Sequence, residues 1–338
     1  MEEIHQKPKG KKKRWLWGGL GIIVLLLLGA TWAISYRPIV VKGPKVHPRW
    51  TGITAKKFPK VKGLKLHVFN TGVNWVSSLL VGKTSQWRPA PAFVIEHPTK
   101  GLVVFDCGLD ETIAQKGENA LPFTVRMLFK TRSKPGRLLD QQMKAAGLSP
   151  KKVTTVLLSH LHFDHVGRAS AFSHAQFIAG AGARKHDQSV DMGFQPALLK
   201  DIPANRWRGI SLKETKAYAT FDRAVDLFGD QSIWIILGGG HAHNDLGALV
   251  MLPQGPVLLA GDMAVHHPWL RGDDVQRIAS KPDRAAHVRN QIRAFLQLDN
   301  KAIVIPGHDL TGLPEGRSDL VLHHPEWFKV KAWNTQTL

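Results

Sequence analysis

The chain has 338 residues, of which 43% are hydrophobic, so it can form one sizeable folded domain with appendages, and a chain disordered throughout is excluded. Its net charge of +20 is concentrated near the N-terminus, because residues 1–65 carry 15 Lys and Arg side chains against two Glu. No nucleic-acid-binding motif accompanies this charge, so we expect a membrane-flanking segment and no nucleic-acid partner.

The first predicted element is a membrane anchor. Residues 1–14 are basic, and residues 15–36 form an uncharged apolar stretch long enough to cross a bilayer as a helix. We expect an uncleaved signal anchor, with a cleaved signal peptide as the alternative. The basic flank predicts a cytoplasmic N-terminus and a single-pass protein of the cell membrane whose catalytic domain is extracytoplasmic.

A basic stalk is predicted next, over residues 37–63. Four prolines and several lysines in this segment favour an extended conformation. The remaining residues, 64–338, are predicted to form one domain.

Within that domain, short apolar runs alternate with turn signals. The first half predicts strands at 64–69, 77–82, 92–97 and 102–108, a helix through 138–146 and a buried strand at 153–158. The second half predicts strands near 232–238, 247–252 and 256–260, a helix from an N-cap at Asp283 to Leu298, and a last strand at 302–305. Two strand-rich halves that each end in helices indicate an α/β fold with two packed sheets and helices outside them.

Cys107 is the only cysteine of the chain. An intramolecular disulfide and a cysteine-based zinc site are therefore excluded. Since Cys107 ends the apolar run VVFDC, we expect a buried structural thiol, with a nucleophilic role as the alternative.

The strongest chemical signal is the run SHLHFDHVG at 159–167, directly after the buried strand. In an extended segment His160 and His162 point to the same side, and Asp164 and His165 follow where the chain turns into a helix. Imidazole and carboxylate groups are typical zinc ligands, and four of them within six positions predict a metal site with room for two ions.

Three further candidate ligands follow apolar strands in the second half. They are His241 in GGGHAHND, Asp262 in LLAGD and His308 in IVIPGHD. The carboxyl ends of strands are where open α/β sheets place ligand sites, so these side chains are expected to join the first group.

The motifs HLHFDH, GH, AGD and PGH, in this order, resemble those of the metallo-β-lactamase-fold hydrolases, over about residues 64–315. Within that superfamily, the stretches at 89–108, 138–167 and 303–309 are similar to the acyl-homoserine lactonase-like branch. The resemblance implies a four-layer αβ/βα sandwich with two divalent ions, expected to be Zn²⁺. It implies one ion held by His160, His162 and His241, and a second held by Asp164, His165 and His308, with Asp262 bridging both.

Several residues near these motifs remain open. His243 is an alternative to His241 as a ligand, and Val265 stands where some lactonases of the branch have a tyrosine. His266 is a candidate for facing the pocket, and Asp106, at a strand end, is a candidate for orienting a ligand or for capping the strand.

The expected activity is metal-assisted hydrolysis. A hydroxide shared by two ions would attack an ester or lactone carbonyl, and Asp164 is the candidate for passing a proton to the leaving group. The expected substrate is a small ester or lactone. Phosphodiester hydrolysis at the same site and a non-catalytic, metal-stabilised binding module are the alternatives, and the oligomeric state is left open.

Overall fold

A computed structural model describes residues 39–43, 45–46, 58–185, 193–275, 279–324 and 326. Contacts between Cα atoms group residues 38–338 into one compact unit. Among the described residues, no helix has the length and apolar content needed to cross a membrane. The predicted anchor at 15–36 lies outside the described residues.

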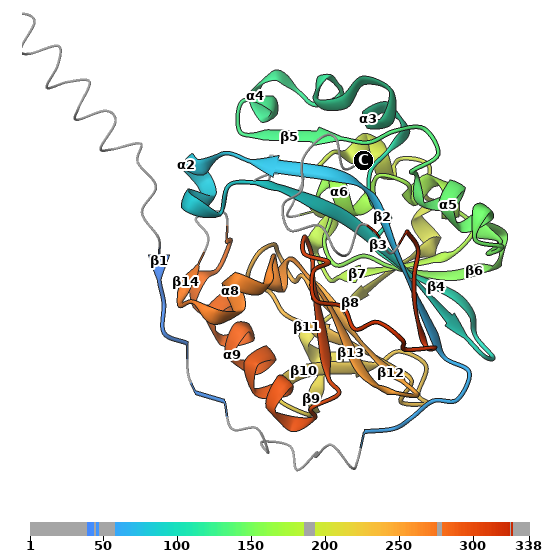
Figure 1. Cartoon of the computed structure of the whole chain (residues 1–338), viewed down its shortest axis with the longest axis vertical. Helices are drawn as coiled ribbons and strands as arrows, with labels where there is room; N and C mark the ends of the chain where they lie inside the picture. Colours follow the sequence, from blue (N-terminus) through green and yellow to red (C-terminus); the bar gives the residue numbers. More distant parts are fainter. Residues whose placement is uncertain are drawn as a thin grey trace, which may run out of the picture. The chain divides into compact units, whose positions relative to one another are not determined.

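The larger of two main sheets has eight strands (Figure 1). Seven of them run in the order β16-β2-β3-β4-β6-β7-β8, and β5 pairs with β2 on the side. Their bounds are β2 Lys65–Val76, β3 Trp87–His97, β4 Gly101–Phe105, β5 Phe129–Arg132, β6 Val153–Leu157, β7 Gln176–Gly180, β8 Trp207–Ile210 and β16 Leu320–Leu322.

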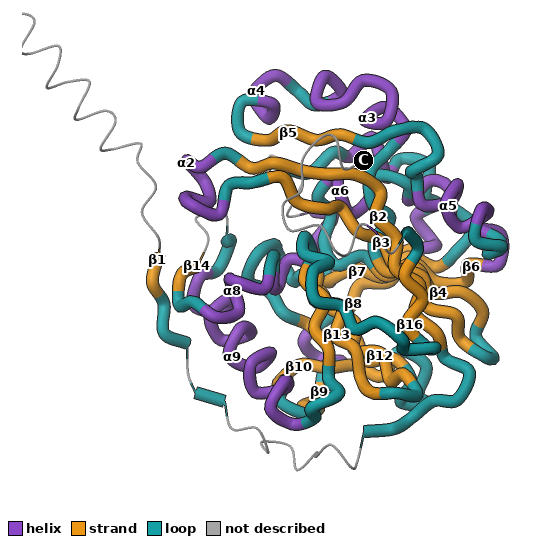
Figure 2. The backbone as a smooth tube through the Cα atoms, in the orientation of Figure 1, coloured by secondary structure: helices purple, strands orange, loops and turns teal. Residues whose placement is uncertain are grey.

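The smaller sheet has six strands in the order β15-β13-β12-β11-β10-β9. Their bounds are β9 Lys216–Tyr218, β10 Phe221–Asp226, β11 Ile233–Leu237, β12 Leu246–Leu252, β13 Gly255–Gly261 and β15 Ile303–Pro306. Figure 2 shows the strands of both sheets in the interior, with helices and loops around them.

The helices are mostly short. They are α2 Ser78–Val81, α3 Glu111–Lys116, α4 Phe123–Arg126, α5 Leu139–Ala145, α6 Phe163–Val166, α8 His267–Arg271 and α9 Pro282–Leu298. The 3-10 turns are η2 Gly82–Thr84, η3 Gly117–Ala120, η4 Pro150–Lys152, η5 Ala169–Phe172, η6 Pro196–Leu199, η7 Ala204–Arg206, η8 Leu212–Glu214 and η9 Asp262–Ala264.

The alternation of side chains along β11 explains the layers. Ile233, Ile235 and Leu237 point into the core between the two sheets, while Trp234 and Ile236 point to the opposite face. That opposite face packs against α8 and α9. The larger sheet is likewise covered on its outer face by residues of α5 and η5, so both sheets are buried on both sides. The predicted mixed α/β sandwich is confirmed, and its order is helix, sheet, sheet, helix.

Three local predictions were wrong. Residues 78–84 form α2 and η2 in place of a strand, because Ser77 caps the turn by accepting a hydrogen bond from the Leu79 amide. The N-cap of α9 is Lys281, since Pro282 occupies the first helical position and leaves Asp283 inside the first turn. The strand at β15 is not the last, because β16 follows and pairs in parallel with β2.

Some residues of the predicted stalk at 37–63 contact the domain. Strand β1 (Ile39–Val40) pairs with β14 (Asp274–Val275), and the fully buried Arg289 donates a 2.9 Å hydrogen bond to the Val41 carbonyl. Phe58 is buried against the ring of Phe295. The domain therefore begins before residue 64, since these residues pack on α9.

Candidate metal centre

The predicted ligands all follow strands, as their positions in the sequence indicated. His160 follows β6, His241 follows β11, and His308 follows β15. Asp262 begins η9, directly after β13. Because β13 and β15 are parallel neighbours, their carboxyl ends bring Asp262 and His308 to the same edge of the smaller sheet.

The seven predicted ligand side chains come together at this edge. Three groups have ligand atoms within 4.8 Å of one another: His160 with His162 and His241, His160 with His165 and Asp262, and Asp164 with His165 and His308. Of the seven, all but His162 are buried. The structure therefore brings together all seven residues of the predicted two-ion set.

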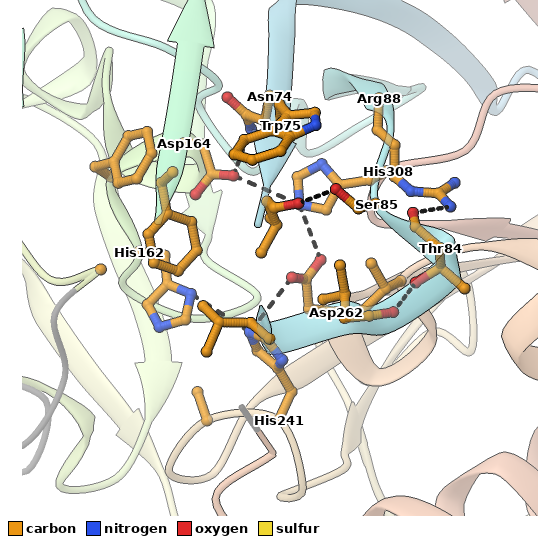
Figure 3. Close-up of a pocket in the computed structure, with 18 of the residues that line it drawn as sticks. Asn74, Trp75, Thr84, Ser85, Arg88, His162, Asp164, His241, Asp262 and His308 are labelled. Carbon is orange, nitrogen blue, oxygen red and sulfur yellow. Dashed lines mark hydrogen bonds and ion pairs between the residues drawn. The ribbon is translucent and has the colours of Figure 1, made fainter. Parts of the chain in front are cut away.

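The two carboxylate oxygens of Asp262 face different groups of histidines (Figure 3). Oδ2 lies 3.3 Å from His241 Nε2, which in turn lies 3.4 Å from His162 Nδ1. Oδ1 lies 3.4 Å from His308 Nε2 and 3.6 Å from His165 Nε2. Asp262 thus has the position of a bridge between two donor sets.

Hydrogen bonds orient three of the histidine rings so that one ring nitrogen of each faces the centre. The Ser159 hydroxyl donates to Asp106, so its oxygen is free to accept from His160 Nδ1 at 3.0 Å. His308 Nδ1 donates to the Pro89 carbonyl at 2.8 Å, and His165 Nδ1 donates to Asp106 at 2.8 Å. In these three rings the bond at Nδ1 fixes the ring orientation and turns Nε2 toward the centre.

Three of the atoms that face the centre are buried and have no hydrogen-bond partner among the described residues: His160 Nε2, His165 Nε2 and Asp262 Oδ1. Buried polar atoms without a partner are costly, so a cluster of three at one point is typical of a site that binds a cation. The donor set of imidazole and carboxylate fits Zn²⁺ or a similar divalent ion.

The charges at the centre are strongly coupled. Burial lowers the pKa of His160 well below its ordinary value, with the neighbouring His165 and His162 adding to the effect. Burial also opposes protonation of His165, but Asp164, Asp106 and Asp262 raise its pKa to about 10. A buried pocket with three carboxylates attracts positive charge, which is a further property expected of a cation site.

Sequence reasoning missed two residues that hold the ligands in place. The Asn74 amide donates a 2.6 Å hydrogen bond to Asp164 Oδ2. Asp245 accepts hydrogen bonds from the backbone amides of Gly239, Gly240, His241 and Ala242, and so fixes the loop that carries His241. The run GGGHAHND contains Asp245, and an acidic residue just after a glycine-rich loop was the available signal.

The contacts of the residues whose roles the sequence left open distinguish between those roles. Asp106 contacts both His165 and Ser159, as a residue that orients ligands would. His243 lines the cavity, but none of the three ligand groups contains it, and its Nε2 lies 3.2 Å from the Asn244 amide. His266 is buried and accepts a hydrogen bond from the Trp269 amide, so it caps α8 and does not line the cavity. Cys107 is fully buried, as expected of a structural thiol.

The centre opens into a cavity of about 500 Å³ (Figure 3). Its walls are largely apolar and come from β2, α2, β5 and α6, with Trp75, Leu80, Val81, Phe129 and Phe163 among them. Val265, which stands where some lactonases of the branch have a tyrosine, also lines the cavity. A pocket of this size and character suits a small amphiphilic molecule.

Comparison with known proteins agrees with this geometry. The family described as the metallo-beta-lactamase superfamily matches residues 85–308. The chain belongs to this superfamily. The match includes every candidate ligand, from His160 to His308.

Several named proteins are similar in sequence. The N-acyl homoserine lactonase AttM of Azorhizobium caulinodans is 28% identical over 67% of this chain and 84% of its own length. The gamma-lactamase FDB1 of Fusarium pseudograminearum is 32% identical over 57% of this chain and 49% of its own. The cytochrome P450 monooxygenase mpaDE of Penicillium brevicompactum is 30% identical over 57% of this chain, but the match spans only 24% of mpaDE.

Solved structures show the same fold at low sequence identity. An N-acyl homoserine lactone hydrolase with N-hexanoyl-L-homoserine bound at its catalytic metal centre superposes with a TM-score of 0.62 at 19% identity, over 74% of this chain and 94% of its own. AidC, a dizinc quorum-quenching lactonase, has a TM-score of 0.51 at 15% identity, over 74% of this chain and 89% of its own.

Proposed function

We propose that the chain is a metal-dependent hydrolase that uses two divalent ions, expected to be Zn²⁺, to cleave a lactone or ester bond. The observation that carries the proposal is the position of Asp262, whose two oxygens each face one of two histidine groups at the end of a largely apolar cavity. The similarity to AttM and FDB1 favours a cyclic ester or amide as the bond that is cleaved.

The roles of the residues follow from their positions. His160, His162 and His241 would hold one ion, and Asp164, His165 and His308 the other, with Asp262 shared. Ions held there would supply Lewis acidity toward a carbonyl oxygen and would lower the pKa of water. Asp164 lines the cavity, so its carboxylate is the group proposed to pass a proton to the leaving group.

The cavity walls support a substrate with an apolar part. Trp75, Leu80 and Phe129 would bury a hydrocarbon chain and exclude water from the reacting bond. Burial of each methylene group contributes about 0.8 kcal/mol, so affinity should rise with chain length until the cavity is filled.

A panel of substrates tests the proposal. The metal-loaded protein is assayed with lactones, aryl esters, thioesters, β-lactams and phosphodiesters, beside a His160→Ala variant and the control His174→Ala, which changes an exposed histidine away from the centre. We expect lactone or ester turnover that His160→Ala lowers by about 10³-fold or more, and that the control retains. Turnover of phosphodiesters alone would contradict the substrate class, and inactivity with two bound ions would indicate a binding module.

We also propose that residues 15–36 anchor the protein in the cell membrane as a single span, with residues 1–14 in the cytoplasm and the domain outside. The support is the length of the uncharged segment and its basic flank. We expect activity from a C-terminal reporter of the kind that works only outside the cytoplasm. Activity of a reporter that works only in the cytoplasm would refute this orientation.

A further inference from the structure

Exposed apolar side chains gather at one end of β2 and β5. The exposed fraction is 68% for Phe123, 66% for Met127 and 40% for Leu79. Phe123 lies in α4, Met127 directly follows it, and Leu79 lies in α2. Side chains of this size are usually buried in a globular domain, so three of them in one region require an explanation.

Two backbone contacts bring these residues together. The Ser77 amide, just before α2, donates a 2.8 Å hydrogen bond to the Leu128 carbonyl, just after Met127. Val76 at the end of β2 is paired with Phe129 at the start of β5. Helices α2 and α4 therefore lie at the same corner of the domain, as Figure 1 shows.

Three basic side chains belong to the same elements as the apolar ones or to the next elements along the chain. The guanidinium carbon of Arg126 lies 5.6 Å from the centre of the Phe123 ring, and Lys130 Nζ lies 5.0 Å from that of Trp75. Lys83 lies in η2, directly after α2, and is exposed. The nearby carboxylate of Glu118 is paired with Arg132 at 3.0 Å. The corner thus combines apolar tips with positive charge.

The same corner is adjacent to the cavity in the chain. Leu80 and Phe129 line the cavity, and each is within two residues of an exposed apolar side chain, Leu79 or Met127. Lys130 belongs to both surfaces, since it is exposed and also lines the cavity. The exposed apolar corner is therefore adjacent to part of the apolar wall of the cavity.

We propose that this corner, the pocket rim formed by Leu79, Lys83, Phe123, Arg126, Met127 and Lys130, binds the surface of an anionic lipid bilayer. The apolar tips would enter the boundary between headgroups and acyl chains, while the basic side chains contact lipid phosphates. When the protein is bound in this way, its cavity would open toward the bilayer. An amphiphilic substrate would then reach the cavity without crossing water. The binding itself does not rest on the proposed hydrolysis.

A bilayer fits the pocket rim better than a second copy of the chain does. A stable protein interface buries about 800 Å² per partner around an apolar core with few charges. Here three apolar tips are interleaved with three cations, which would repel the same cations of a symmetric copy. Long basic side chains can instead extend to lipid headgroups while their stems cover apolar surface.

The test measures contact with lipid at a single position. The full chain is reconstituted in vesicles that contain phosphatidylglycerol and lipids with a nitroxide quencher on the acyl chain. A fluorescent probe is attached to Met127→Cys or to the control Leu212→Cys. Because Cys107 is fully buried and its burial raises the pKa of its thiol, only the introduced cysteine is labelled. Leu212 is 52% exposed and follows β8, at the opposite edge of the larger sheet from β2.

We expect at least about threefold stronger quenching at position 127 than at position 212, and a loss of this difference in the added double variant Leu79→Ser, Phe123→Ser. Residues 1–37 are common to all variants, so the difference reports the pocket rim alone. Equal quenching at both positions would overturn the proposal. Shielding of the probe at position 127 in the absence of lipid would also overturn the proposal. Shielding that grows with protein concentration would indicate a second copy of the chain, and shielding that disappears when residues 327–338 are deleted would indicate that segment. Quenching does not depend on turnover, so a failure of lipid binding can be distinguished from a failure of the proposed hydrolysis.

Discussion

The hydrogen bond from Asn74 to Asp164 shows how single residues prepare the centre. Asp164 Oδ2 lies 3.5 Å from His308 Nε2, and Asn74 fixes this oxygen from the other side at 2.6 Å. The sequence placed Asp164 at the site, because its motif has a distinctive spacing. Asn74 was missed since it is 90 positions away and belongs to no motif, so only the folded chain brings the two together.

Asn74→Ala should lower turnover more than metal content. Without the amide the Asp164 carboxylate is free to rotate, and we expect kcat to fall about tenfold with both ions still bound. Kinetics and metal analysis of the same preparation measure the two effects. Asn205→Ala, an exposed position in η7, is the matched control. Unchanged kcat in Asn74→Ala would mean that Asp164 needs no such support.

At the scale of elements, local pattern decided which predictions succeeded. The strands β11, β12 and β13 are apolar on both faces and were predicted within a residue or two. The run SSLLVG also contains consecutive apolar residues but forms a helical turn, because three apolar residues do not distinguish a short strand from a turn. Strands β1 and β16 pair with partners more than 200 residues away, and no local pattern reports such a partner.

The attachment of β16 should depend on pH. His323 follows β16 and lies 3.1 Å from His67 of β2. Burial, with the neighbouring His67 and His324, lowers the pKa of His323 to about 4. Because the folded pKa is below the unfolded value of about 6.5, the unfolded chain binds the proton more tightly, and stability present above pH 6.5 is lost as the pH falls toward 4.

Urea unfolding at pH 7 and pH 4.5 measures this loss. After allowance for partial exposure, we expect His323 to account for about 2 kcal/mol of the difference in free energy of unfolding between the two pH values. The variant His323→Gln should show a smaller difference, while the exposed His174→Gln should behave as the parent chain. Identical pH dependence in all three chains would contradict a role for His323.

At the scale of the whole molecule, the domain includes residues that the sequence assigned to a stalk. The guanidinium of Arg289 is fully buried, and it donates to the carbonyls of Val41 and Asp274 at 2.9 and 2.8 Å. Composition favoured an extended stalk because prolines and lysines are frequent there. The pairing of β1 with β14 stabilises this segment on the domain in spite of its composition.

Two N-terminal truncations should therefore differ in stability. A chain that begins at residue 38 keeps the contacts of Val41, whereas a chain that begins at residue 64 loses them and removes Phe58 from its packing. We expect the shorter chain to be less stable by about 3 kcal/mol or more, because a buried guanidinium loses a partner and an aromatic contact is lost. Thermal unfolding compares them, and equal stability would show that residues 38–63 behave as a free stalk.

We propose that one carboxylate, Asp262, completes two metal sites. Elemental analysis of the metal-loaded protein and of its Asp262→Ala variant counts the divalent ions bound per chain. We expect two ions per chain in the parent and at most one in the variant, because both donor sets lose an oxygen at 3.3 to 3.4 Å from a histidine nitrogen. A parent chain that binds fewer than two ions, or a variant that keeps both, would contradict it.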